Sequence, residues 1–308
     1  MNKKKSKNYF YKIYNLKIKS SIRCDELLPS DDHQYDVHIR FGPVPDFLNN
    51  ALAKSESYQV AEEQVLLKIE NTAKYLIKNG NEIVIEKKKD VPDNEINIFL
   101  LGSAMGALIH QREMLPLHGC SVEIQNKGFV FLGKAGIGKS TLAASFYQNG
   151  DRVLTDDVTV IAFNSDHHPI ILPGYPRIKL WDDSMGMIDK GTNNIIFSKN
   201  SFYKHQLSIK DCFLESPVPL GGLYLLTSSA KKNIVIKQLS GYEQMIELSK
   251  NTYRGIFLKK QNDLRYHFNQ CSTILNNVPL KKVIRPVDNF SVDYLRDNLK
   301  NDIINPIK

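Results

Sequence analysis

Hydrophobic and polar residues alternate along the first ninety positions in the manner of β-strands. Tyr35–Phe41 alternates with period two, the pattern of a half-buried strand. The apolar runs Ala73–Ile77 and Ile83–Ile85 flank Asn79-Gly80, a pair that accepts the positive φ of a tight turn, so a hairpin is predicted there. A charged segment ending at Pro92 closes the region. Residues 1–91 are therefore expected to form a β-rich N-terminal domain, whose strand edge could capture a peptide.

After residue 92 the pattern changes to strands that alternate with helices. The first helix is expected from a cap at Asp93 or Asn94 to about Glu113, with an apolar face made of Ile98, Leu101, Met105 and Leu108. Further strands are predicted at 117–124, 128–132, 152–154, 158–163, 223–226 and 234–236, the last two buried, and further helices at 140–148, 242–249, 263–275 and 292–299. This order predicts an α/β fold for a second, larger domain over residues 92–308.

Composition and charge narrow the classes of partner. The chain has 308 residues, 42% hydrophobic and 24% charged, which is typical of a soluble globular protein. Its 41 basic and 33 acidic residues give a net charge of +8, half of it from lysines within the first seven residues. The remaining excess suits an anionic ligand such as a nucleotide and is too diffuse to indicate nucleic-acid binding.

Membrane and redox features complete this picture. The most apolar stretch, Ile96–Ile109, is shorter than the ~20 residues of a spanning helix, so no membrane association is expected. The four cysteines lie far apart, and their spacing suggests neither a disulfide framework nor a zinc site. No apolar run follows the basic start, which argues against a secretory signal. A cytoplasmic protein with reduced thiols is expected.

The strongest chemical motif is a phosphate-binding loop. Residues 133–140 match G-x-x-x-x-G-K-[ST], with an apolar strand before them and a helix-forming segment after them. The glycines let successive N–H groups face a phosphate, and the helix adds its positive N-terminus. Lys139 is placed to meet the β- and γ-phosphates, and the Ser140 hydroxyl suits Mg²⁺. The expected ATP-binding residues are Gly133, Lys134, Ala135, Gly136, Ile137, Gly138, Lys139, Ser140 and Thr141.

An acidic pair supplies candidates for a base and a metal ligand. Asp156 and Asp157 lie between two strand-like segments. One carboxylate could hold Mg²⁺ while the other takes a proton from an attacking hydroxyl. Neighbours on a strand point to opposite faces, so one of them could be structural, and an Asp-Asp turn is the plain alternative. Next to a phosphate loop, the catalytic interpretation is favoured.

The order of these motifs resembles the catalytic core of the HPr serine kinase/phosphorylase family. The resemblance covers 117–163: His118-Gly119 opening a strand, the phosphate loop, then the Asp pair. It implies a P-loop, HPr-kinase-like fold and a serine kinase that uses ATP and Mg²⁺. It also implies that Asp156 is the general base, that Asp157 helps to hold Mg²⁺, and that His118 lies beside the pair. By itself a lone histidine at a strand start is more often a core residue.

Looser segments resemble the branch of that family found with lasso-peptide biosynthesis. They are 11–20, 36–45, 173–181, 219–224 and 248–254. The resemblance implies phosphorylation of a ribosomally made precursor peptide on its C-terminal serine. HPr kinases form rings, so a homo-oligomer is also compatible with the resemblance.

Three basic residues are candidate substrate contacts. Arg177 and Lys179, in the proline-rich segment 173–181, could meet phosphates or a C-terminal carboxylate; a structural turn leading into a helix at Trp181 explains that segment equally well. Arg254 could supply positive charge to the transferring phosphoryl group, and a surface salt bridge explains it as easily.

The sequence thus predicts a serine kinase of two parts. The favoured acceptor is a peptide with a C-terminal serine. HPr or another protein is the first alternative. A nucleotide-binding regulator without transfer is the second.

Overall fold

The computed structural model describes residues 7–181, 195–196, 205–230, 233–259, 261–287 and 291–306. Its contacts divide the chain into two compact units. The first comprises residues 1–116 and 253–269, and the second comprises 117–252 and 270–308. In the described part of the chain, no helix has the length and apolar character needed to cross a membrane.

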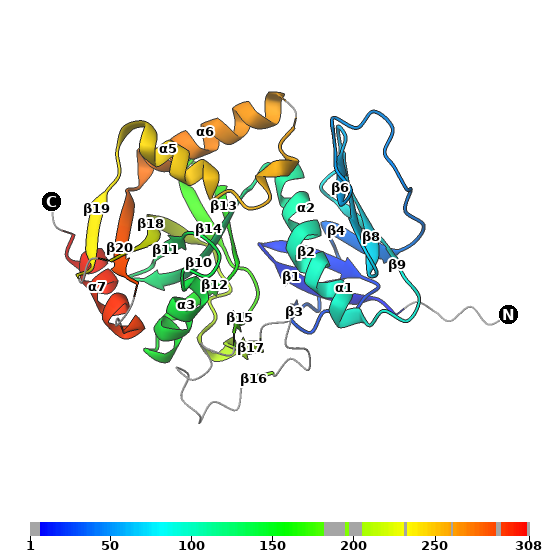
Figure 1. Ribbon diagram of the computed structural model, residues 1–308. Coiled ribbons are helices and arrows are strands. Elements are labelled where there is room, and N and C mark those ends of the chain that lie inside the picture. The colour runs from blue at the N-terminus through cyan, green and yellow to red at the C-terminus, as the bar shows by residue number, and fades with distance from the viewer. Residues whose placement is uncertain are drawn as a thin grey trace. The chain divides into compact units, whose positions relative to one another are not determined.

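A nine-stranded sheet forms the first unit, in the order β3-β1-β2-β4-β9-β8-β7-β6-β5 (Figure 1). Its strands are β1 (Tyr9–Ile13), β2 (Leu16–Ser20), β3 (Leu28–Pro29), β4 (Val37–Phe41), β5 (Ala53–Lys54), β6 (Tyr58–Val60), β7 (Gln64–Ile69), β8 (Ala73–Lys78) and β9 (Glu82–Lys87). Along β2 the buried residues Leu16 and Ile18 alternate with the half-buried lysines 17 and 19, because successive side chains face opposite sides of a sheet. The strands of this sheet occupy the region between residues 9 and 87.

The predicted hairpin is present as β8 and β9. The two strands pair antiparallel around Asn79 and Gly80, which have φ of 52° and 63°. Two consecutive positive φ values match the twist of paired strands, which is why Asn-Gly is favoured there.

A continuous helical segment packs on this sheet, and it is less regular than predicted. It consists of α1 (Asp93–Phe99), a π-helical turn at Leu100–Ala104, and α2 (Met105–Gln111). Tyr75 of β8 donates its buried hydroxyl to the carbonyl of Ile96 across 3.0 Å, joining helix to sheet.

Two details of the helix prediction are wrong. Neither Asp93 nor Asn94 caps the helix, since the cap position is Pro92. Ile98 is exposed, whereas Leu101, Met105 and Leu108 are buried. The wider π turn rotates the buried face, so one 3.6-residue period does not hold along the whole segment.

An eight-stranded mixed sheet forms the core of the second unit. The order is β11-β10-β13-β14-β18-β20-β19, with β12 beside β10 and an additional pairing of β11 with β18. The bounds are β10 (Leu115–Ile124), β11 (Lys127–Leu132), β12 (Arg152–Thr155), β13 (Val158–Phe163), β14 (Pro169–Leu172), β18 (Val218–Ser229), β19 (Val235–Gln238) and β20 (Leu280–Pro286). The extra pairing closes β11, β10, β13, β14 and β18 into a ring of strands.

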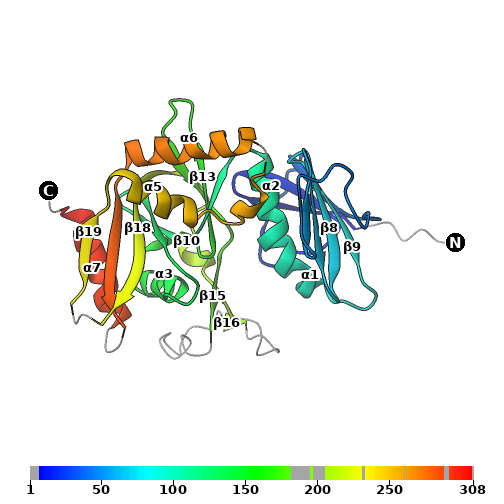
Figure 2. The ribbon, with the colours of Figure 1, turned by 45° about the horizontal axis from the view of Figure 1, so that its top comes forward.

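Helices cover this sheet and connect its strands (Figures 1 and 2). They are α3 (Lys139–Gln148), α5 (Gly241–Lys250), α7 (Val292–Ile304) and the part of α6 (Gln261–Asn277) from residue 270 on, since residues 261–269 belong to the first unit. Phe131 of β11 stacks on Phe146 of α3 with ring centroids 5.3 Å apart, which fixes α3 on the strand before the phosphate loop. Helix α3 also packs against α7. The predicted alternation of strands and helices is confirmed, so the chain has a mixed α/β fold.

A small sheet of three strands lies beside these elements in the second unit. It pairs β15 (Arg177–Leu180), β17 (His205–Ser208) and β16 (Ile195–Ile196) in the order β15-β17-β16. Segment 173–181, for which a turn into a helix was one interpretation, contains a strand from Arg177 to Leu180. Residues 182–194, where a helix after Trp181 would begin, lie outside the described residues.

The compact units differ from the predicted domains in where the first helix belongs. The boundary predicted at 91/92 assigns the helical segment 93–111 to the second domain. The contacts of this segment with β8 place it in the first unit instead. The N-terminal and kinase domains therefore stay predictions as functional divisions.

Candidate functional site

The phosphate loop connects β11 to α3 with three glycines at positive φ. Gly133, Gly136 and Gly138 have φ of 142°, 81° and 100°. A Cβ on Gly133 would lie 2.8 Å from the carbonyl oxygen of Leu226, so only glycine fits there. At Gly136 and Gly138 an added Cβ meets no described atom within 4 Å. The loop is tight at its start and faces open space at its middle, where α3 begins.

Lys139 spans this loop from the first turn of α3. Its Nζ donates to the carbonyls of Gly133 at 2.7 Å and Lys134 at 3.1 Å. The residue is buried, although it carries a charge. A buried ammonium needs acceptors, and these two carbonyls provide them from within the loop.

His118 lies between Lys139 and the acidic pair. Its Nε2 is 3.2 Å from the Nζ of Lys139, and its Nδ1 is 3.7 Å from Oδ1 of Asp157. An ammonium only donates, so Nε2 must accept and the imidazole carries its proton on Nδ1, towards Asp157. The imidazole therefore contacts the phosphate-loop lysine on one side and the acidic pair on the other.

The two carboxylates lie in different environments. Asp156 is 4% exposed, and its Oδ2 accepts the backbone N–H of Lys179 at 2.9 Å. The Asp157 side chain is 33% exposed and faces His118. They lie in the bend between the end of β12 at Thr155 and the start of β13 at Val158, so the turn named as the plain alternative is present, with both carboxylates in it. Such a difference allows the two groups to perform different tasks.

Lys179 adds a second cation to the cluster. Its Nζ is 3.9 Å from Oδ2 of Asp157 and 5.7 Å from the ring centroid of Tyr175. The pKa of Lys179 is raised by interaction with the Tyr175 hydroxyl and with the carboxylates of Asp157 and Asp156, although burial opposes this. Burial raises the pKa of Tyr175. Lys179 is thus a charged partner of the Asp pair.

The contacts that define this cluster among the described residues do not include the other two basic candidates. Arg177 begins β15 and is buried, 6% exposed. Arg254 belongs to the first unit, has φ of 54°, and places its guanidinium 5.5 Å from the ring centroid of Tyr253. The structure therefore groups Lys139, His118, Asp156, Asp157 and Lys179, while Arg177 and Arg254 stay predictions as substrate contacts.

Sequence reasoning missed two side chains that contact the phosphate loop. Oδ1 of Asn251 accepts the N–H of Gly133 at 3.1 Å, and Nη2 of Arg285 donates to the carbonyl of Ile137 at 3.1 Å. Asn251 follows α5 and Arg285 lies on β20, both more than a hundred residues beyond the loop. Only the folded sheet brings them there. Asn251 lies in segment 248–254, which was noted for its resemblance, but only Arg254 was chosen from that segment, and no motif marked Arg285.

The residues present fit a nucleotide-bound Mg²⁺ better than a resident metal. Among the described residues, no group of three metal-ligating His, Cys, Asp or Glu side chains occurs. Mg²⁺ in phosphoryl-transfer sites takes one or two protein oxygens together with phosphate oxygens and water. The half-exposed Asp157 and the hydroxyl of Ser140 at the start of α3 supply oxygens of that kind.

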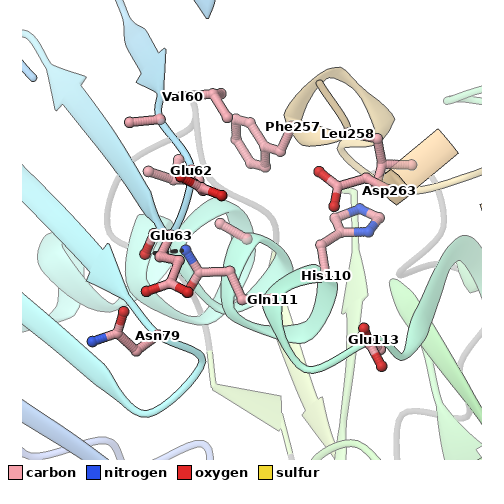
Figure 3. Close-up of a pocket in the computed structure, with 13 residues that line it drawn as sticks. Val60, Glu62, Glu63, Asn79, His110, Gln111, Glu113, Phe257, Leu258 and Asp263 are labelled. Carbon is pink, nitrogen blue, oxygen red and sulfur yellow. Dashed lines mark hydrogen bonds between the residues drawn. The ribbon is translucent and has the colours of Figure 1, made fainter. Parts of the chain in front are cut away.

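A separate pocket of about 310 Å³ lies in the first unit (Figure 3). Its labelled acidic lining residues include Glu62, Glu63 and Asp263. His110 lines it as well; burial lowers the pKa of this imidazole to about 4, although a hydrogen bond to the Tyr253 carbonyl opposes the shift. The grouped kinase candidates all belong to the second unit.

Comparisons with known proteins bear on the core motifs. No protein-family model matches the chain. A stretch of 55 residues is 38% identical to the HPr kinase/phosphorylase of Lactobacillus acidophilus, covering 18% of this chain and 17% of that protein. The chain also aligns with the structure of the Hpr(Ser) kinase/phosphatase from Coxiella burnetii, at 13% identity and a TM-score of 0.34, over 62% of this chain and 88% of that one. The partial sequence match points to the HPr kinase/phosphorylase family.

Proposed function

We propose that the protein is an ATP-dependent kinase that transfers the γ-phosphoryl group to a serine hydroxyl. The observation that carries this proposal is the chain of contacts from Lys139 through His118 to Asp157, with Asp156 adjacent. It brings a phosphate-binding lysine and a pair of carboxylates into one site. Those are the parts that phosphoryl transfer requires.

The loop performs the binding step. Its N–H groups and the start of α3 face the space at Gly136 and Gly138, where phosphate oxygens would be accepted. The Lys139 ammonium, now on the carbonyls of Gly133 and Lys134, would exchange them for β- and γ-phosphate oxygens. Because these two carbonyls are neutral, a negatively charged phosphate competes favourably with them for the Lys139 ammonium.

The acidic pair performs the proton and metal steps. As the resemblance implies, Asp156 would take the proton of the serine hydroxyl as its oxygen bonds to the γ-phosphorus and ADP leaves. Asp157 and Ser140 would hold Mg²⁺, which when bound neutralises charge on the β- and γ-phosphates. Lys179 would keep Asp156 in place through its backbone N–H.

The acceptor we propose is the C-terminal serine of a ribosomally made precursor peptide of the lasso type. This part rests on the resemblance of the flanking segments. Lys179 supports it, since it is a cation at the Asp pair that could receive a C-terminal carboxylate. The alternatives are HPr or another protein as acceptor, and a regulator that binds ATP without transfer.

Intact-mass analysis after incubation with ATP and Mg²⁺ tests the proposal. The acceptors are a peptide ending in serine, the same peptide ending in alanine, and HPr, with Asp156→Asn as the inactive control. We expect a single phosphoryl group on the serine-ending peptide alone. Transfer to HPr alone would replace the peptide acceptor with a protein. ATP binding without transfer to any of the three would overturn the peptide-kinase proposal.

A further inference from the structure

Two side chains from outside the loop motif bond to the phosphate loop, one near each end. At the start, Oδ1 of Asn251 accepts the N–H of Gly133. Near the end, Arg285 donates to the carbonyl of Ile137. Both residues come from parts of the second unit outside the loop motif.

The bond from Arg285 fixes the direction of a loop amide. In a planar trans peptide, the C=O of one residue and the N–H of the next point in opposite directions. Since the Ile137 carbonyl is bound by a guanidinium on one side, the N–H of Gly138 must point to the other. Gly138, at φ 100° and ψ 18°, then directs the chain into α3. Arg285 thereby orients one of the donors that a phosphate would meet.

Asn251 fixes the start of the loop and also the strand that carries His118. Its Nδ2 donates to the carbonyl of Glu247 at 2.8 Å, so the side chain is held by the end of α5. Its own carbonyl accepts the N–H of His118 at 2.7 Å. One residue therefore sets the position of Gly133 and of the imidazole that meets Lys139.

Arg285 reaches the loop because the sheet places β20 two strands from β11. β18 pairs in parallel with both, and Arg285 is opposite Ser228 near the end of β18. Nη1 of Arg285 also donates to the carbonyl of Pro286 at 2.7 Å, which limits the freedom of its side chain. Burial lowers the pKa of this guanidinium. A partly desolvated arginine bonds a carbonyl more strongly than an exposed one does.

We propose that Asn251 and Arg285 are positioning residues that hold the phosphate loop in its binding conformation before the nucleotide arrives. This inference rests on the proposed nucleotide binding and adds two residues to it. A preformed loop spends no binding energy on ordering its amides. Neither residue needs to touch the nucleotide.

Calorimetric titration with inorganic pyrophosphate tests this, because pyrophosphate contacts the loop without an adenosine. We expect Arg285→Met and Asn251→Ala each to weaken binding about tenfold, the loss of one hydrogen bond that orders the loop. Arg285→Lys, which retains a donor, should recover part of the affinity. Thermal melts of each variant report on folding separately.

Matched controls remove similar side chains from other places. Arg296→Met deletes an arginine that donates to the Ser145 carbonyl of α3. Asn298→Ala deletes an asparagine with the same 2.8 Å bond to the carbonyl four residues before it. Both should leave pyrophosphate affinity within twofold.

The outcomes separate this inference from the proposed function. If the unaltered protein binds neither pyrophosphate nor ATP, nucleotide binding itself is wrong. If it binds both, and folded Arg285→Met and Asn251→Ala bind pyrophosphate as tightly as it does, the positioning role is wrong. If either variant does not fold, Arg285→Gln and Asn251→Leu replace them, since glutamine is too short to reach the Ile137 carbonyl and leucine has no acceptor. If these variants are folded and have the pyrophosphate affinity of the controls, the positioning roles are also refuted.

Discussion

Nε2 of His118 lies 3.2 Å from the Nζ of Lys139, and its Nδ1 lies 3.7 Å from Oδ1 of Asp157. Because an ammonium can only donate, Nε2 accepts its hydrogen bond and the imidazole proton is on Nδ1, facing Asp157. The two ring nitrogens therefore have separate tasks. One supports the residue that would bind phosphate, and the other faces the acidic pair.

Amide substitutions separate those two tasks. His118→Asn places an amide near the Nδ1 position, and His118→Gln places one near Nε2. We expect His118→Asn to keep about tenfold more turnover than His118→Gln, and His118→Gln to keep the tighter ATP binding. Initial rates and ATP titrations measure both quantities. Equal losses in both variants would show that the nitrogens act only through packing.

The carboxylates should respond differently to removal of charge. Asp156→Asn should lower kcat about a hundredfold or more and leave ATP affinity within twofold, because a general base acts after binding. Asp157→Asn should instead raise the Mg²⁺ concentration required for half-maximal rate. Rates measured over a Mg²⁺ series distinguish them. If Asp156→Asn shifts the Mg²⁺ requirement and Asp157→Asn does not, their roles are exchanged.

Two glycines with positive φ should differ in the stability they contribute. Gly133→Ala combines a left-handed φ of 142° with a 2.8 Å approach to the Leu226 carbonyl oxygen, and should cost about 3 kcal/mol. Gly150, at φ 82° with no described atom within 4 Å of an added Cβ, provides the matched site; Gly150→Ala should cost about 1 kcal/mol. Urea denaturation gives both values. Equal costs would show that the contact with Leu226 does not constrain the loop.

The low pKa of His110 predicts a pH dependence of folding. Its pKa is about 4 in the folded chain against about 6.5 when unfolded, so as pH falls below 6.5 only the unfolded state takes up the proton. Stability is lost progressively down to pH 4 and no further from this group below that. At pH 5 the loss is about 2 kcal/mol.

The variant His110→Gln should lose correspondingly less between pH 7.5 and pH 5. Urea titrations at the two pH values provide the comparison, and the same difference is measured for the unaltered chain. Identical pH differences in the two proteins would mean that His110 ionises normally in the folded state.

Local sequence patterns predicted most of the helices and strands, whereas features that depend on contacts between distant parts of the chain were missed. The hairpin turn at Asn79-Gly80 and the loop at Gly133–Ser140 are short, and their own residues favour the backbone conformation that each adopts. The hairpin and the loop are therefore where they were expected. The strand 234–236 was expected to be buried, yet β19 is a largely exposed edge of the sheet. Three apolar residues in a row do not reveal whether a partner strand covers them.

The site shows the same division. The Asp pair could be proposed from its position after the phosphate loop, and His118 only from the family resemblance; the structure places Nδ1 of His118 3.7 Å from Oδ1 of Asp157. Asn251 and Arg285 could not be proposed, because their loop contacts depend on how α5 and β20 are placed around β11. Lys179 was chosen for its charge. Its backbone bond to Asp156 depends on where β15 lies, which the chain order does not reveal.

The closed ring of strands gives the phosphate loop an unusually protected base. β11 is paired with β10 on one side and with β18 on the other, so its amides have no free edge through which solvent could reach them. Exchange of these amide hydrogens for deuterium requires the ring to open, an event close to global unfolding. β19 pairs only with β20 in the described sheet and should exchange much earlier. The strand that carries the loop should therefore remain among the last parts of the second unit to open.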